Sequence, residues 1–201
     1  MKTYAAAASL LLYSSTQAYS QTKTCYTYNY GRSVWAVQRY LSADDNLEYL
    51  TGDYYFGRFF DIDKKQLIKK TDFIPLPSMW VDFKDARLDT TQTLRQLLTP
   101  HYQIYTGFLL KGSHLVTLLR SYSDVPPGSK KIKGLGPTED SESQLIYDLY
   151  RKNDLCIFFE PMLRTYAYLR GETVVYFDFA SKSMKAFTKK EYLAIYSRQK
   201  H

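Results

Sequence analysis

Residues 101–122 hold the pattern that most narrows the fold of this chain. Two runs, 101–110 and 113–122, place mostly apolar residues at every second position, and the pair Lys111-Gly112 separates them. Alternation with a period of two is typical of a strand with one buried face, and a short glycine-containing link between two such runs favours a tight turn. We therefore predict a β-hairpin here, and with it a fold that contains antiparallel sheet.

Short aromatic stretches elsewhere predict more strands. Tyr and Phe are enriched in strands, and the chain has 20 Tyr and 11 Phe. Residues 79–83 are expected to form a short strand, and residues 53–70 two strands joined by a polar turn. The last third of the chain holds four further candidates, at residues 155–160, 164–169, 173–179 and 184–187.

Apolar spacing and end signals predict helices between these strands. The expected helical ranges are 33–41, 43–52, 89–100, 141–154 and 189–196. The expected caps at their first turns are Ser33, Asp89, and two capping boxes, Ser141 with Gln144 and Thr188 with Glu191.

These elements together predict an α+β fold: a mainly antiparallel sheet with three to five peripheral helices in a single domain. The chain of 201 residues is 45% hydrophobic, which is enough for one sizeable core. A lipocalin-like β-barrel is the alternative. The helices are too many and too widely spread for that fold, and no lipocalin signature is present, so α+β is preferred.

The N-terminus resembles an export signal. Lys2 precedes an apolar run over 5–13, and small residues follow at positions that fit cleavage after Ala18 or Ser20. We therefore expect residues 1–20 to be a signal peptide and 21–201 the folded domain of a secreted or periplasmic protein. The apolar run is too short for a stable membrane anchor. The alternative is an amphipathic N-terminal helix of a cytosolic protein.

Two cysteines, Cys25 and Cys156, follow the leader. In an oxidising compartment they could form a disulfide, and closing so long a loop contributes on the order of 4 kcal/mol. The alternative is that Cys156 is a small core residue with a free thiol. Neither a CxxC motif nor a Cys/His cluster occurs in the sequence, so no structural metal site is expected.

The composition of residues 124–141 predicts a mobile surface loop. The segment has two adjacent prolines, at 126 and 127, and no aromatic residue, so it offers little to bury. Loops of this length inside a compact domain are uncommon and are often functional. A partner-binding lid and a flexible insertion both fit this composition.

The predicted hairpin also suggests a ligand-binding face. With Lys111-Gly112 as the turn, His114 lies opposite Leu109, Gln103 opposite Arg120 and His101 opposite Tyr122. This register brings five polar or aromatic residues to one sheet face, which could hold an anionic or sugar-like ligand. They are His101, Gln103, Tyr105, Arg120 and Tyr122. The alternative is an ordinary half-covered sheet, in which such residues are routine.

Catalytic and cofactor motifs are missing from the sequence. It has no GxSxG, Walker-type GK[ST], HExxH or SxxK pattern, and no cofactor or metal is expected. In the predicted register, His101 and His114 lie about 27 Å apart along a strand, too far to share an ion. The candidate acids form no diagnostic pair; they are Asp82, Asp85, Glu160 and Asp178.

Three functions therefore remain open. The preferred one is a non-enzymatic binding or interaction protein that uses a Tyr-rich sheet face for a small ligand or a protein partner. The alternatives are an enzyme of unrecognised class acting on a small anionic or sugar-like substrate, and a structural, envelope-associated protein. The formal net charge is +7, but the basic residues are scattered, so we expect a solvated surface and no nucleic-acid partner.

Overall fold

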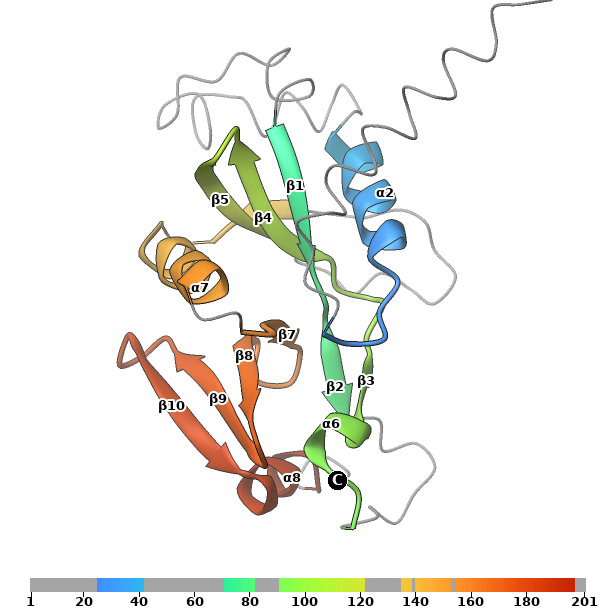
Figure 1. The fold of residues 1–201 in the computed structure, drawn as a ribbon, viewed down its shortest axis with the longest axis vertical. Helices are drawn as coiled ribbons and strands as arrows, with labels where there is room; N and C mark the ends of the chain where they lie inside the picture. Colours follow the sequence, from blue (N-terminus) through green and yellow to red (C-terminus); the bar gives the residue numbers. More distant parts are fainter. Residues whose placement is uncertain are drawn as a thin grey trace, which may run out of the picture.

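The expected hairpin lies at the centre of a four-stranded antiparallel sheet (Figure 1). The computed structural model describes residues 25–41, 71–81, 91–121, 135–138, 140–152 and 155–197. The strand order in this first sheet is β1-β4-β5-β6. Its strands are β1 (Thr71–Leu76), β4 (Thr106–Lys111), β5 (His114–Ser121) and β6 (Leu135–Pro137).

The register of the hairpin differs from the expected one. Lys111 pairs with His114, so the turn is Gly112-Ser113, and Gly112 takes the left-handed conformation (φ 62°) that glycine adopts without strain. A bulge between Leu109 and Leu110 then shifts the pairing again, so that Arg120 lies opposite Thr106. The expected pairings of Arg120 with Gln103 and of His114 with Leu109 are therefore wrong.

A second antiparallel sheet has the order β10-β9-β8-β7. Its turns include Gly171 (φ 57°) and Lys182 (φ 50°), which are both in the left-handed region. All four strands predicted in the last third of the chain belong to it. They are β7 (Phe158–Glu160), β8 (Thr165–Arg170), β9 (Thr173–Asp178) and β10 (Ser183–Thr188).

A short two-stranded sheet connects the two larger ones. It consists of β2 (Met79–Val81) and β3 (Leu98–Pro100). Just before β2, the Phe159 N–H donates to the Pro77 carbonyl at 2.8 Å, and Ser78 forms a parallel bridge with Phe159. The edge of the second sheet therefore meets the segment that leaves the first.

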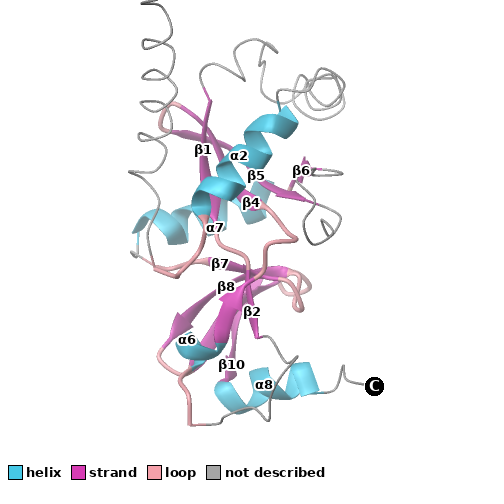
Figure 2. Cartoon of the chain, turned by 90° about the vertical axis from the view of Figure 1, so that its right-hand side faces the viewer, coloured by secondary structure: helices cyan, strands magenta, loops and turns pink. Residues whose placement is uncertain are grey.

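Four helices flank the sheets in the described part of the chain (Figure 2). They are α2 (Tyr30–Leu41), α6 (Leu94–Leu97), α7 (Asp140–Lys152) and α8 (Lys189–Ser197). Helices α2 and α7 lie on opposite sides of the first sheet (Figure 1), and α8 contacts β9 and β10 of the second.

Three of the expected helix starts are wrong, and one is right. The Arg32 N–H is capped by the Asn29 side chain at 3.1 Å, so α2 begins before Ser33. Helix α7 begins at Asp140, which places Ser141 inside the helix. The Thr188–Glu191 capping box is present, with the Thr188 N–H donating to the glutamate at 2.8 Å and the Glu191 N–H donating back at 3.3 Å.

The third wrong start is that of the helix expected over 89–100, which begins later and is much shorter than predicted. Thr93 caps α6 in a capping box with Gln96, and only four residues are helical. The following residues pair instead with β2, with Thr99 opposite Trp80. Strand pairing with a distant segment therefore overrides the local helical pattern.

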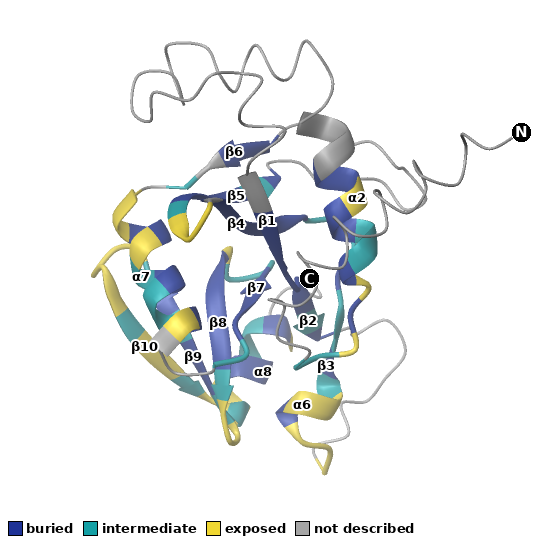
Figure 3. Ribbon diagram, turned by 45° about the horizontal axis from the view of Figure 1, so that its top comes forward, coloured by how far each residue is buried: buried dark blue, intermediate teal, exposed yellow. Residues whose placement is uncertain are grey.

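Two cores hold the layers together, as the dark blue strands of Figure 3 illustrate. The first core joins one face of each sheet to α7, through side chains such as Phe108, Tyr150 and Tyr166. The second lies on the other face of the second sheet, where Phe158 packs with Tyr192 and Tyr196 of α8. Because strand neighbours point to opposite faces, Phe158 and Phe159 serve different cores.

The described elements confirm the α+β fold in a single small domain, and their sheets do not close into a lipocalin-like barrel. Part of the expected 124–141 loop is ordered, because β6 pairs with β5 and Leu135 is buried. The expected elements at 43–52 and 53–70, and the expected signal peptide, lie outside the described residues.

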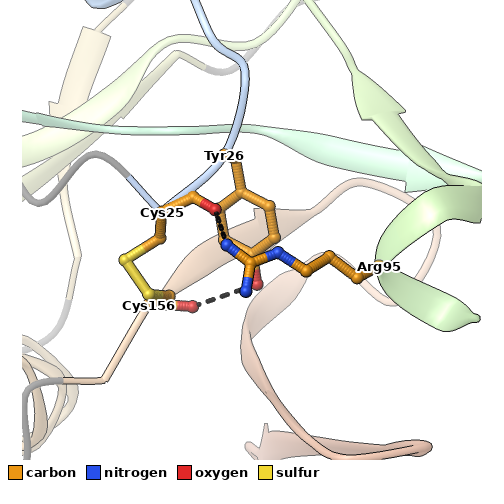
Figure 4. The surroundings of a disulfide bond; sticks show 4 residues. All are labelled: Cys25, Tyr26, Arg95 and Cys156. Atoms are coloured by element: carbon orange, nitrogen blue, oxygen red, sulfur yellow. Dashed lines mark hydrogen bonds between the residues drawn. A yellow bond between two sulfur atoms is a disulfide. The ribbon is translucent and has the colours of Figure 1, made fainter.

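Cys25 and Cys156 form a disulfide across a sequence separation of 131 residues, with their Cα atoms 5.5 Å apart (Figure 4). Neighbouring groups fix the same junction. The Tyr26 hydroxyl donates to the Cys156 carbonyl at 3.3 Å, and the Arg95 guanidinium donates to the Cys25 carbonyl. The bridge thus ties the segment before α2 to the segment before β7.

Candidate functional site

A cavity of about 560 Å³ lies where both large sheets meet the β2–β3 pair. Cavities of this size suit small ligands. It is lined by Trp80, His101, Gln103, Ile104, Arg120, Ser121, Phe159, Pro161, Met162 and Arg164.

Strand alternation explains why two aromatic side chains reach this cavity. Met79 and Val81 are buried in the second core, whereas Trp80 between them is only partly buried: it packs against that core and also lines the cavity. In β7, Phe158 lies in the second core and Phe159 on the cavity side. The cavity therefore has an apolar wall that the hairpin pattern alone does not reveal.

His101 sits directly after β3 and is held from two directions. Its backbone N–H donates to the Ser78 carbonyl at 2.8 Å. Its ring meets the Trp80 indole edge-on, with centroids 4.6 Å apart and planes at 69°. His101 is buried, so its position is set by packing as well as by the backbone.

Arg120 is the best-positioned charge at the cavity. Its guanidinium lies over the Phe159 ring, 5.2 Å from the centroid, and donates to the Arg164 carbonyl at 3.3 Å. Stacking on an aromatic face and a carbonyl bond both restrict the long side chain before any ligand arrives. A guanidinium has five N–H donors, so donors remain for a ligand after this one bond is made.

Arg164 ends the turn between β7 and β8 with a backbone φ of 54°. The left-handed region costs a non-glycine residue roughly 1 kcal/mol, so this conformation is held by its surroundings. The strained turn places Arg164 in the cavity lining beside Arg120, whose guanidinium bonds to the Arg164 carbonyl.

The carboxyl group of Glu160 points away from these arginines. Glu160 lies between Phe159 and Pro161 in sequence, but its side chain faces α8 and is fully buried. It accepts hydrogen bonds from the Tyr192 and Tyr196 hydroxyls and from the Leu163 N–H. Burial raises the pKa of Glu160 above its ordinary value, despite these donors. The cavity lining in the described residues thus carries positive charge without a carboxylate.

Three of the five residues of the predicted ligand face line this cavity: His101, Gln103 and Arg120. Tyr105 does not, because its backbone bonds to Ser121 and its side chain is buried on the α2 side, where its hydroxyl accepts from the Arg32 Nε at 3.3 Å. Tyr122 lies outside the described residues.

Sequence reasoning missed the wall formed by Trp80, Phe159, Met162 and Arg164. Alternation in two short strands could have assigned outward faces to Trp80 and Phe159. The pairing of those strands across the two sheets is a tertiary contact, and no local pattern encodes it.

Asp178, another of the candidate acids, does not line the cavity. Asp178 lies in the β9–β10 hairpin, where it pairs with Lys185 and accepts from Ser181. The Lys185 and Ser181 hydrogen bonds lower the pKa of Asp178 to about 2. Asp82 and Asp85 lie outside the described residues, and no group of three metal-ligating side chains occurs within them.

No protein-family model matches this chain, and no curated protein or solved structure is significantly similar to it. None of the helices in the described ranges is long and apolar enough to cross a membrane. The function must therefore be argued from the cavity itself.

Proposed function

We propose that this protein is an exported, non-enzymatic binding protein that holds a small organic anion in the cavity between its sheets. The ligand class is a carboxylate carried on a ring. The ring lies against Trp80 and Met162, and the carboxylate is held by Arg120 and Arg164. The observation that carries this proposal is the placement of Arg120, stacked on Phe159 and hydrogen-bonded to the Arg164 carbonyl.

Physical chemistry supports an anion at this place. A planar guanidinium matches a carboxylate in two-point geometry, and such charge-assisted bonds contribute about 1.5–3 kcal/mol each. The net charge of +7 also favours the approach of anions. Export is supported by the N-terminal pattern and by the Cys25–Cys156 bridge, since disulfides persist in oxidising compartments.

Binding is favoured over catalysis because the described lining has His101 but no carboxylate to form an acid–base pair with it. The structural, envelope-associated alternative has less support. The two large hydrophobic side chains that stand exposed in the described residues, Trp35 and Phe179, lie in α2 and just after β9. A contact surface requires a contiguous apolar patch.

Trp80 provides a built-in reporter for the test. The chain has two tryptophans, so a Trp35→Phe background leaves Trp80 as the sole indole. We would titrate this protein with benzoate, glucuronate, inorganic phosphate and benzamide, and follow its fluorescence. We expect saturable binding of benzoate or glucuronate on the order of 1 mM or tighter. Benzamide, which has the shape of benzoate without its charge, should bind at least ~10-fold more weakly.

A matched pair of variants locates the site. Arg120→Gln should weaken binding by ~10-fold or more. Arg151→Gln should not, although Arg151 also stacks on an aromatic ring, 5.6 Å from the centroid of Tyr147 in α7. Equal binding of benzoate and benzamide, or unchanged affinity in Arg120→Gln, would overturn the proposal.

A further inference from the structure

Helix α8 supports two walls of the cavity from the side that faces away from the cavity. One wall is the turn that follows Glu160, the last residue of β7, and runs from Pro161 to Arg164. The other is β2, where Trp80 precedes Val81. Glu160 and Val81 both point to the second core, against α8.

A single hydroxyl of α8 contacts both walls. Tyr196 donates a hydrogen bond to Glu160 Oε1 and accepts one from the Val81 N–H at 3.2 Å. Glu160 Oε2 in turn accepts from the Leu163 N–H inside the turn. The chain of bonds therefore runs from the residue after Trp80, through Tyr196, to the backbone that carries Arg164.

Because the hydrogen bonds of the Tyr196 hydroxyl are buried, removing that hydroxyl should be costly. Tyr196 is 5% exposed and Val81 2% exposed, so water cannot replace the hydroxyl if it is removed. A buried N–H left without a partner is costly, and the backbone shifts to find another acceptor. Such a shift at Val81 moves Trp80, and a shift at Glu160 moves the turn.

We propose that Tyr196 is a positioning residue for the ligand cavity and sets the distance between Trp80 and the Pro161–Arg164 turn. Its role as a determinant of affinity rests on the function proposed above. The connection itself, in which α8 fixes both walls, is a property of the fold and can be tested without a ligand.

Tyr192 provides a matched control. Its hydroxyl also donates to Glu160, at 3.1 Å, and it lies one helical turn before Tyr196. Its hydroxyl bonds to Glu160 and Tyr196, whereas the Tyr196 hydroxyl also reaches β2. Tyr192→Phe thus removes a bond to the same carboxyl group but leaves the Val81 bond in place.

The test compares Tyr196→Phe and Tyr192→Phe in the Trp35→Phe background. We expect Tyr196→Phe to weaken benzoate binding by ~5-fold, the equivalent of one neutral hydrogen bond, and Tyr192→Phe by less than ~2-fold. Hydrogen exchange at the Val81 amide should accelerate in Tyr196→Phe alone. Trp80 emission in the ligand-free protein should also shift only in that variant.

The two readouts separate the possible failures. If no anion binds the parent protein, the proposed function fails, and exchange at Val81 and Trp80 emission still decide whether α8 fixes the walls. Equal affinity loss in the two variants, or Val81 exchange unchanged in Tyr196→Phe, would overturn the positioning role. Loss of thermal stability in both variants, with affinity lost only in Tyr196→Phe, supports it.

Discussion

The Arg120 guanidinium lies 5.2 Å from the centre of the Phe159 ring, so a charged residue of one sheet stacks on an aromatic residue of the other. The contact crosses the junction at which the two sheets meet, and the cavity opens beside it. The contact fixes the orientation of the guanidinium, whereas a flexible cationic side chain in water would take many orientations.

The shape of the Arg120 head group should matter as well as its charge. Arg120→Lys keeps the positive charge but loses the planar fork and most of the stacking on Phe159. We expect benzoate affinity to fall by ~3- to 10-fold, which is less than in Arg120→Gln. Fluorescence titration of both variants checks this order, and equal affinity of Arg120→Lys and the parent would contradict it.

The left-handed backbone conformation of Arg164 should lower the stability of the protein. Arg164→Gly removes a non-glycine residue from the left-handed region, and we expect the free energy of unfolding to rise by up to ~1 kcal/mol while anion affinity falls. Lys182→Gly is the control, because Lys182 has a similar φ of 50° in a hairpin away from the cavity. It should gain stability without losing affinity. Urea denaturation and titration of both variants decide the matter.

Glu160 should make stability depend on pH. Burial, the largest influence, raises the pKa of Glu160 in the folded protein above its ordinary value near 4.5. The native state therefore retains this proton where the unfolded chain has lost it. The resulting stability is full below the ordinary pKa and is lost as pH rises through the folded value.

Glu160→Gln removes this titration while keeping an acceptor for the Leu163 N–H. The free energy of unfolding of the parent minus that of the variant should fall as the pH rises from ~4 toward neutrality. Denaturation of both proteins at several pH values measures this difference, which cancels the titration of other groups. A constant difference would show that Glu160 ionises alike in both states.

The Cys25–Cys156 bridge should contribute substantially to stability. Closing a loop of this size restricts the unfolded chain by about 4–5 kcal/mol in free energy. We expect the Cys25→Ser/Cys156→Ser variant to unfold at a lower urea concentration than the parent. A reductant should destabilise the parent and leave the double variant unaffected, and a reductant without effect on either protein would contradict this role.

Gly107 in β4 should not tolerate a side chain. A Cβ at this position would lie 2.3 Å from the Ile74 carbonyl oxygen and 2.6 Å from the Phe73 ring. The carbonyl belongs to the neighbouring strand and cannot move freely, so Gly107→Ala should cost about 1–3 kcal/mol of stability. Thermal unfolding tests this, with Gly112→Ala as a control in which strain arises from φ and not from crowding.

The elements that could be predicted are those whose signals are local. The central hairpin, the four strands of the second sheet and the Thr188–Glu191 cap each depend on neighbours in sequence. The position of the hairpin turn could not be predicted, because Lys111-Gly112 and Gly112-Ser113 both place glycine in a two-residue link. The bulge at Leu109 carries no local signal, and it is what pairs Arg120 with Thr106.

The candidate site also has one part that could be predicted from the sequence and one part that could not. His101, Gln103 and Arg120 could be named because they belong to one hairpin region. Strand alternation predicts Tyr105 on the same face, but residues 101–105 precede β4 and are not a strand, and Tyr105 is buried near Arg32. The opposite wall, with Trp80 and Arg164, depends on contacts between segments far apart in the chain, which alternation alone cannot bring together.

The disulfide between Cys25 and Cys156 also determines how the molecule responds to proteolytic cleavage. Every peptide bond between the two cysteines lies within one covalent ring, because the bridge spans 131 positions of the chain. A protease that hydrolyses a single bond in that ring opens it without releasing a fragment. Such a nicked molecule keeps its mass, apart from one added water, and separates into two polypeptides only when the sulfurs are reduced.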